Sequence, residues 1–433
     1  MRAWSNWAGT QVCRPLEEVA PRDPEGVVEA LVRARERGIP VKAVGSGHSF
    51  TGAAVTDGML LHLDALTGLV DVDLPRRRVR VLAGTPLHVL NPALQALGLA
   101  LPNLGDIDRQ TISGAISTGT HGTGTRRQGL AAAVCGLTLA LADGSTLNCS
   151  ADEHAEVFHA ARVGLGALGV ILDVELQCVP AFRLHAREGG EDLLDLLDRI
   201  QHEADTNDHL DLHWFPHTDR VLVKRNNQVA DGAGRAPLAP WRAWLDDELL
   251  SNRVFELTNR ASARWPRIVP RLNQVTSRVL SSREYTDDSW RVFCTTRDVR
   301  FVESEYAVPR AAASDVLLAL RDWIATHEVS LPFPVEVRFV GADDVWLSTA
   351  YERENAYIAV HQYHRMAYTR YFEAFEAIVA EHEGRPHWGK LHTLDAAALR
   401  SRYPRFDDFL VVRDRLDPQR LFANAYLTQV LGE

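Results

Sequence analysis

The chain has 433 residues, of which 46% are hydrophobic and 24% charged, and 47 basic against 57 acidic residues give a formal net charge of -10. This is the composition of a globular protein long enough for two domains and a large core. No basic stretch is longer than Arg76-Arg77-Arg78, which argues against a nucleic-acid partner because duplex binding needs a concentrated cationic surface.

The first 180 residues combine few helices with several short strands. Apolar residues at helical spacing predict helices over Pro24 to Gly38 and over Leu87 to Leu97. Alternating or β-branched runs predict strands at PVKAV (40–44), MLLHL (59–63), twice in VDVDLPRRRVRVLAG (70–84), as a hairpin in LTLALADGSTLN (137–148), and at ALGVILDVELQCV (167–179). The Asp143-Gly144 pair is the expected turn of that hairpin. Together these elements predict an α+β domain.

Long helical stretches alternate with strands from about residue 180 onward. The expected helices are LLDLLDRIQHEA (193–204), SDVLLALRDWIATHEV (314–329) and YFEAFEAIVAEHE (371–383). The expected strands include HLDLHWFP (209–216), PVEVRFV (334–340) and AYIAVHQY (356–363). This order predicts a second α+β domain, with residues 230–241 as a small-residue surface loop.

The stretch VGSGHSF (44–50) places one histidine, His48, in a turn of glycine and serine. Small residues let several backbone N–H groups face one point, and such a concavity binds an anion, most often a phosphate. No Gly-Lys-Ser/Thr follows, so the turn is not a Walker loop, and the strand that comes next excludes the dinucleotide fingerprint. The spacing alone leaves open a tight surface turn with an incidental histidine.

A second run of small residues, SGAISTGTHGTG (113–124), also carries a histidine, His121. Its backbone and hydroxyl groups offer many hydrogen-bond partners with little bulk. One such loop is weak evidence. Two of them in one domain favour a large phosphate-bearing ligand with a flat ring.

Charged residues interrupt two apolar stretches in the second half. In PVEVRFV, Glu336 and Arg338 point to the same face of the expected strand because the side-chain period is two. They form either a polar clamp for a hydroxylated ligand or a structural ion pair. In RPHWGKLH (385–392), Lys390 is either a fixed cation beside a ring or a solvated loop residue.

Five stretches in order, VGSGHSF, SGAISTGTHGTG, PVEVRF, RPHWGKLH and LDPQRLFANAYL, resemble the sugar-1,4-lactone oxidase family. This family contains L-gulonolactone oxidase and D-arabinono-1,4-lactone oxidase, and its members are flavoproteins of the vanillyl-alcohol-oxidase type. The resemblance begins at Asn6-Trp7-Ala8-Gly9 and is least diagnostic over residues 185–300. It implies an α+β fold with an FAD-binding domain (1–180), a cap domain on the substrate side (181–380), and a C-terminal segment (381–433) that returns to the flavin.

The resemblance also implies the cofactor contacts. The backbone of Gly45 to Ser49 would cradle the pyrophosphate, Val170 would lie on the adenine side, and His48 would bond covalently to the 8α-methyl group of FAD. Such a link makes the flavin a stronger oxidant. The full implied set of FAD contacts is Val44, Gly45, Ser46, Gly47, His48, Ser49, Phe50, Gly105, Asp106, Ser113, Gly114, Thr118, Gly119, Thr120, His121 and Val170.

Four residues match the catalytic positions of the family: Glu336, Arg338, Lys390 and His361. The implied reaction transfers a hydride from a CH–OH carbon of the substrate to flavin N5, while the hydroxyl proton leaves. Arg338 and Lys390 would stabilise the developing negative charge, and Glu336 would orient neighbouring hydroxyls. Oxygen or another acceptor would then reoxidise the flavin. No metal is expected.

Three positions bear on the substrate and the electron acceptor. Asp106 and Tyr363 replace a serine and a threonine of the related alditol oxidases, which favours a lactone over an open-chain polyol. Gly105 matches a glycine common in oxygen-reactive relatives, where a plant lactone dehydrogenase has alanine. The expected substrate is L-gulono-, L-galactono- or D-arabinono-1,4-lactone. The alternatives are an alditol (xylitol or sorbitol) oxidase and, against the retention of Glu336, Arg338 and Lys390, a flavin-binding protein without activity.

The remaining features concern the expected location. The five cysteines are scattered and form no close pair, which is typical of buried thiols in a reducing compartment. The N-terminus lacks the pattern of a signal peptide, and no run of about 20 apolar residues is present. We therefore expect a cytoplasmic protein without a transmembrane segment.

Overall fold

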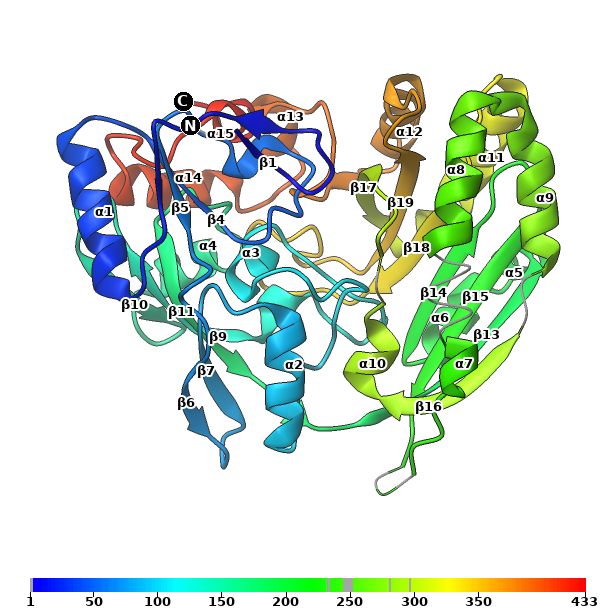
Figure 1. Cartoon of the computed structure of the whole chain (residues 1–433), viewed down its shortest axis with the longest axis horizontal. Helices are drawn as coiled ribbons and strands as arrows, with labels where there is room; N and C mark the ends of the chain where they lie inside the picture. The colour runs from blue at the N-terminus through cyan, green and yellow to red at the C-terminus, as the bar shows by residue number, and fades with distance from the viewer. Residues whose placement is uncertain (1–2, 231, 233, 244–251, 280–281, 296) are drawn as a thin grey trace.

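Two large β-sheets form the two halves of the molecule, on the left and right of Figure 1. The computed structural model describes residues 3–230, 232, 234–243, 252–279, 282–295 and 297–433. Strands and helices are mixed along the whole chain, so the predicted α+β class is confirmed.

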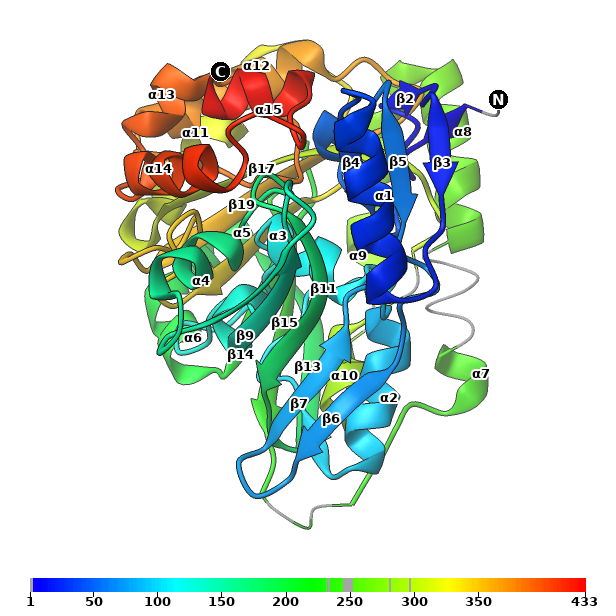
Figure 2. The same cartoon turned by 90° about the vertical axis from the view of Figure 1, so that its left-hand side faces the viewer.

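The first half contains a parallel three-stranded sheet and an antiparallel five-stranded sheet. The three-stranded sheet has the order β3 (Glu17–Val19), β5 (Met59–His62), β4 (Val41–Val44). The five-stranded sheet has the order β10 (Thr146–Ser150), β9 (Val134–Ala140), β11 (Val170–Gln177), β7 (Arg78–Leu82), β6 (Leu69–Asp73). Helices α1 (Pro24–Glu36), α2 (Leu87–Ala96), α3 (Ile112–Ser117) and α4 (Ala155–Ala161) pack around these sheets, as Figure 2 shows. Two short ribbons complete this half: β1 (Trp4–Ser5) with β2 (Val12–Cys13), and β8 (Leu99–Ala100) with β12 (Val179–Pro180).

Local sequence signals explain the boundaries of several of these elements. Helix α1 begins where Asp23 accepts a hydrogen bond from the Gly26 N–H at 2.8 Å, with Pro24 in the first turn. The predicted hairpin is β9–β10, and its turn residue Gly144 has a φ of +87°.

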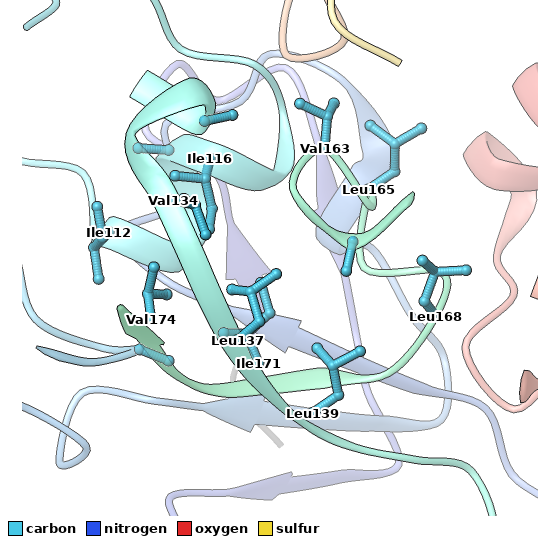
Figure 3. Close-up of a cluster of buried hydrophobic side chains, with 14 of the residues drawn as sticks. Ile112, Ile116, Val134, Leu137, Leu139, Val163, Leu165, Leu168, Ile171 and Val174 are labelled. Atoms are coloured by element: carbon cyan, nitrogen blue, oxygen red, sulfur yellow. The ribbon is translucent and has the colours of Figure 1, made fainter. Parts of the chain in front are cut away.

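An apolar cluster holds α3 against β9 and β11 (Figure 3). Ile112 and Ile116 of α3 pack with side chains from both strands and from the loop that precedes β11. The cluster includes Val134, Leu137, Leu139, Val163, Leu165, Leu168, Ile171 and Val174. It fixes the second small-residue stretch relative to the sheet.

The second half is built on an eight-stranded antiparallel sheet. Its order is β16 (Arg283–Asp288), β13 (Arg183–Asp192), β15 (Arg220–Gln228), β14 (His209–Trp214), β18 (Val335–Val340), β19 (Asn355–Tyr363), β17 (Phe301–Pro309), β20 (Arg385–Pro386). Its helices are α5 (Leu193–Leu197), α6 (Ile200–Thr206), α7 (Pro240–Ala243), α8 (Phe255–Arg264), α9 (Val269–Val279), α10 (Ser289–Phe293), α11 (Ala313–Thr326) and α12 (Thr369–Ala380).

The two faces of this sheet differ in chemistry. On one face, Val335, Val337 and Phe339 of β18 pack with apolar residues of α11 and α12. On the other, Glu336 and Arg338 of the same strand are also buried, because the first half of the molecule covers them. Buried charges need partners, and the alternation of side chains collects those partners on this polar face.

The C-terminal segment returns to the first half. Helices α13 (Ala396–Arg400), α14 (Phe406–Leu416) and α15 (Ala425–Leu431) share an apolar core with α1, β9 and β11. Asn424 Nδ2 donates to the carbonyls of Gly52, Ala53 and Val55 at 2.9, 3.2 and 2.8 Å. These bonds tie the end of the chain to the residues that follow VGSGHSF.

Two sequence-based expectations need correction. The predicted single helix at 193–204 is two helices, α5 and α6, interrupted at Asp198 and Arg199. The stretch SGAISTGTHGTG begins with helix α3, which Thr111 caps by accepting from the Gly114 N–H at 3.3 Å. Within the expected loop at 230–241, residues 231 and 233 lie outside the described residues. No helix among the described residues is both long and apolar enough to cross a membrane.

Candidate active site

The loop after β4 lines a cavity with residues 45–49. β4 ends at Val44, and Gly47 has a φ of +65°, a conformation that favours glycine. None of the four N–H groups from Ser46 to Ser49 donates a hydrogen bond to another described residue. A Cβ atom on Gly45 would lie 2.1 Å from Thr111 Oγ1, so this loop packs directly against the start of the second one. Successive backbone N–H groups in a turn that lack a protein acceptor are suited to bind an anion.

The second loop joins the two halves of the molecule. A Cβ atom on Gly122 would lie 2.3 Å from Asn103 Oδ1, so only glycine fits there. The hydroxyl of Thr123 donates to the Leu210 carbonyl of β14 and accepts from the Phe339 N–H of β18 at 3.2 Å. His209 Nδ1–H donates to the Thr123 carbonyl at 2.6 Å. These bonds set the distance between the loop and the polar face of the large sheet.

The first cavity runs between these loops and the five-stranded sheet. It has a volume of about 1010 Å³ including adjoining solvent. Its lining includes the small polar stretch Ser46, Gly47 and His48 and apolar residues such as Leu165 and Ile171. The cavity therefore offers both N–H donors for a phosphate and apolar contacts for a ring.

The second cavity, of about 620 Å³, continues from the first toward the polar face of the large sheet. The two cavities share four lining residues: His48, Ser49, Gln110 and Thr118. The second cavity is lined by Trp7, Phe50, Gly105, Asp106, Ile107, Thr120, His121, Phe301, Glu303, Glu305, Arg338, His387, Gly389 and Lys390 in addition. A hydroxylated substrate would meet several charged groups in this space.

Arg338 is surrounded by three carboxylates. It donates to Glu336, and its guanidinium nitrogens lie 3.5 Å from Asp106 Oδ1 and 3.8 Å from Asp211 Oδ1. Burial alone would lower the pKa of Arg338, but Glu336, Asp106 and Asp211 raise it well above its usual value. The cation is permanent, and it faces the cavity.

Asp106 and Asp211 respond differently to the same burial. Burial would raise the pKa of Asp106, but Arg297, 2.5 Å away, and Arg338 hold it well below its usual value. Burial and the nearby Glu336 raise the pKa of Asp211 to about 7. Asp211 lies opposite Arg338 in the β14–β18 register, behind the cavity wall.

Lys390, Glu303 and His361 form a second charged group. Lys390 Nζ donates to Glu303 Oε2 and lies 5.2 Å from the centre of the Phe50 ring. His361 Nε2 lies 3.5 Å from Glu303 Oε1, and His361 is the direct cross-strand neighbour of Glu303. The Phe50 N–H donates to the Gly389 carbonyl at 2.7 Å, so the segment with Lys390 is tied to the first loop.

His48 lies where the two cavities meet. Its ring centre is 5.7 Å from that of Trp7, and its ring nitrogens make no hydrogen bond to a described residue. Burial, followed by the charges of Lys390 and Arg109, lowers the pKa of His48 to about 4. The imidazole is thus neutral at physiological pH and is free to react as a nucleophile.

His121 is held by protein groups on both sides of its ring. Nδ1–H donates to the Gly122 carbonyl at 2.9 Å, and Nε2 lies 3.2 Å from Glu305 Oε1. Its ring lies against that of Tyr357, with centres 3.6 Å apart and the planes tilted by 31°. His121, Glu305 and His387 could offer three metal-ligand atoms within 4.8 Å of one another, but the nearby ammonium group of Lys390 disfavours a second cation there.

Most of the predicted site residues meet at the two cavities, whereas Gly119, Glu336 and His361 line neither of them. Glu336 and His361 lie directly behind the wall, in contact with Arg338 and Glu303. The sequence interpretation missed two carboxylates that do line the second cavity, Glu303 and Glu305. Their spacing in FVESEYAVP, at every second residue of an apolar strand, is the same signal that revealed Glu336 and Arg338.

The residues present fit FAD. The pyrophosphate needs a cluster of unpaired N–H groups, which Ser46 to Ser49 provide. The adenosine needs apolar contacts, which the apolar lining residues of the first cavity provide. The isoalloxazine needs a space beside His48 that opens onto polar residues, as the second cavity does.

Comparisons with known proteins agree with this reading. A model of the D-arabinono-1,4-lactone oxidase family matches residues 174–430, and a model of an FAD binding domain matches residues 15–150. The chain is 42% identical over 429 residues to L-gulono-1,4-lactone dehydrogenase of Mycobacterium tuberculosis, with 99% of both chains covered. It is 35% identical over 436 residues to L-gulonolactone oxidase of Mus musculus, with 99% of this chain and 98% of the relative covered.

A solved structure of cholesterol oxidase from Brevibacterium sterolicum has the same fold. The TM-score is 0.83 at 17% identity, and the superposition covers 99% of this chain and 96% of that one. At this identity the likeness shows a shared fold and says nothing about the substrate.

Proposed function

Because the chain belongs to the D-arabinono-1,4-lactone oxidase family of FAD-dependent enzymes that act on CH–OH groups, we propose that its substrate is L-gulono-1,4-lactone or a close aldonolactone, such as the L-galactono or D-arabinono compound. One observation carries the proposal. A buried cation, Arg338, and a half-buried one, Lys390, share a cavity with carboxylates directly beside the expected flavin site. Simple FAD storage requires none of these charged groups.

FAD, held by the loop from Gly45 to Ser49 and by the lining of the two cavities, would supply the hydride-accepting chemistry. The protein supplies binding and electrostatics. Arg338 and Lys390 stabilise negative charge as the substrate hydroxyl loses its proton. Glu336 fixes the guanidinium group of Arg338 from behind, and Asp106 lies in the cavity, where it accepts hydrogen bonds from substrate hydroxyls.

His48 is proposed as the site of covalent FAD attachment. The neutral ring lies beside the second cavity, so a ring nitrogen would be placed to bond the 8α carbon of FAD; the imidazole N–H and one methyl C–H bond would break, and the flavin would be left reduced by two electrons until an acceptor reoxidises it. The bonds of His121 to Gly122 and Glu305 support a non-covalent role for that residue.

The functional division at about residues 180 and 380 also remains a proposal. It is supported by the separate apolar cores of the two sheets and by the return of the C-terminal segment to the first core.

The substrate is tested by mixing the purified holoenzyme with a sugar under anaerobic conditions in a stopped-flow instrument. L-Gulono-, L-galactono- or D-arabinono-1,4-lactone is expected to bleach the flavin absorbance, whereas xylitol and sorbitol are expected to do so poorly. Bleaching by the polyols alone would make the chain an alditol oxidase.

The electron acceptor is tested by repeating the reaction in air and measuring peroxide. A Cβ atom on Gly105 would lie 3.2 Å from the His121 carbonyl oxygen and 3.4 Å from the Thr120 methyl group, so a side chain would crowd the cavity wall here and glycine avoids it. We expect peroxide release for this reason. A reduced enzyme that is stable in air but transfers electrons to a dye would instead be a dehydrogenase.

A further inference from the structure

The charge of Lys390 depends on its surroundings, because a buried ammonium group without a counter-ion loses its proton readily. Only 22% of the Lys390 side chain is exposed, and that part faces the second cavity. Burial lowers its pKa, and Glu303, Glu305 and Asp106 more than offset this, so that the pKa is raised. The proposed role of Lys390 as a cation therefore requires a specific acid.

Charged and titratable groups face Lys390 from every element around it. They are Glu303 and Glu305 of β17, His361 of β19, Asp106 of the loop before α3, His48 of the first loop, and His387 of its own segment. Arg338 of β18 lines the same cavity. Among the described carboxylates, only Glu303 forms an ion pair with Lys390.

The position of Glu303 is fixed independently of Lys390. Its backbone pairs with His361 across β17 and β19, and its carbonyl accepts from the Leu391 N–H at 2.9 Å. His361 Nδ1 lies 3.1 Å from the Pro334 carbonyl, which fixes the imidazole so that Nε2 faces Glu303 Oε1. The other carboxylate oxygen, Oε2, therefore points to Lys390.

We propose that Glu303 is a positioning residue that keeps Lys390 protonated and directs its ammonium group into the cavity, with His361 as the fixed support behind it. The Glu303–Lys390 pairing is a property of the chain's own charges. Only the use of the Lys390 cation in catalysis rests on the proposed function. It assigns a role to a residue that lines the cavity but was absent from the sequence-based set.

Loss of the Glu303 charge should shift the pKa of Lys390 downward by about 1–3 units, the usual effect of an opposite charge at contact distance. The direction of this pKa shift follows from the negative charge of Glu303 in the ion pair with Lys390. The ammonium form is stabilised by Glu303, so it persists to high pH in the native protein and is lost at lower pH once the carboxylate is replaced. Each pH unit above the new pKa then reduces the charged fraction of Lys390 about tenfold.

The test uses Glu303→Gln holoenzyme and two readouts between about pH 7 and 10. The first is the dissociation constant of sulfite, which adds to oxidised flavin to give an anionic adduct that a neighbouring cation stabilises. This readout needs no lactone, so it remains informative even if the proposed substrate is wrong. The second is the pH profile of kcat with the best sugar substrate.

In Glu303→Gln we expect sulfite binding to weaken and kcat to fall as the pH rises above the new pKa of Lys390. This alkaline limb of the two profiles should be absent from the wild-type enzyme over the same range. Glu303→Asp, which keeps the charge, should restore most of the native profile. The double variant Glu303→Gln/Lys390→Arg should also lack the limb, because a guanidinium group remains charged throughout. Glu305→Gln is the matched control, since it is equally buried on the same strand but pairs with His121.

Three outcomes would overturn the inference. One is a flat sulfite profile in Glu303→Gln. Another is a larger alkaline shift in Glu305→Gln than in Glu303→Gln. The third is an alkaline limb that persists in the double variant, because it would then originate from a group other than Lys390. If Glu303→Gln does not retain flavin, the Glu303→Asp and Glu305→Gln profiles still decide, since the first must stay close to native and the second must shift only slightly.

Discussion

Replacement of Arg338 by alanine should affect turnover and stability by different and separable amounts. The change removes a cation that faces the cavity and leaves Glu336, Asp106 and Asp211 close together without it. At 3.5 and 3.8 Å, and with an effective dielectric constant of about 20, the two longer ion pairs each correspond to about 4–5 kcal/mol of attraction. Desolvation of the buried groups offsets part of this, so we expect a loss of about 3–5 kcal/mol in the free energy of unfolding.

The effect on catalysis comes from the lost stabilisation of developing negative charge. One such donor typically contributes about 3 kcal/mol, which is roughly 100-fold in the rate of flavin reduction. Arg338→Lys keeps the charge but loses the planar fork that contacts Glu336, so its rate should fall between native and Arg338→Ala.

The assay is anaerobic stopped-flow reduction of the bound flavin by lactone, with flavin content and melting temperature measured on the same samples. Lys224→Ala is the control. Lys224 belongs to β15 and lies near two of the same carboxylates, Asp106 and Asp211, but it does not line the cavity. It should change the reduction rate by only a few-fold. Near-native reduction by Arg338→Ala at full flavin content would refute the argument and leave Arg338 a purely structural ion-pair partner.

Two further predictions concern FAD itself. After acid or detergent denaturation, the yellow colour should stay with the wild-type chain, whereas in His48→Ala it should leave with the small molecules. Colour that separates from the wild-type chain would exclude a covalent bond. Gly45→Ala should lose most of its FAD, because the new methyl group would lie 2.1 Å from Thr111 Oγ1, and the additional change Thr111→Gly should restore part of it. An unchanged flavin content in Gly45→Ala would show that the loop can move away from α3.

The parts of the site that could be predicted from sequence are those encoded by neighbouring residues. The turn at His48, the second run of small residues, and the shared face of Glu336 and Arg338 all follow from local composition or from the period of a strand. Helix α1 is similarly local, and it was predicted to begin at Pro24, as observed. The α+β class followed from the expected helices and strands, and the cofactor followed from the family resemblance that the ordered motifs carry.

Contacts between distant strands could not be predicted in this way. Glu303 and Lys390 are 87 positions apart, and Asp211 meets Arg338 only because β14 pairs with β18. No local pattern encodes that register. The long helix expected at 193–204 was wrong for a related reason, since the periodicity continued through Asp198 and Arg199, where the structure interrupts it.

The polar face of the eight-stranded sheet has a consequence for protein engineering. Buried ion pairs can often be replaced by apolar residues of similar volume with a gain in stability. Screens for thermal tolerance should therefore favour apolar replacement of both members of a pair, such as Glu303 together with Lys390, although the loss of the cation would lower turnover. Selection for stability and selection for activity would diverge on this one face, whereas the opposite face, with Val337 and Phe339, should tolerate only changes that preserve its packing. Variant libraries for a robust enzyme should leave the polar face unchanged.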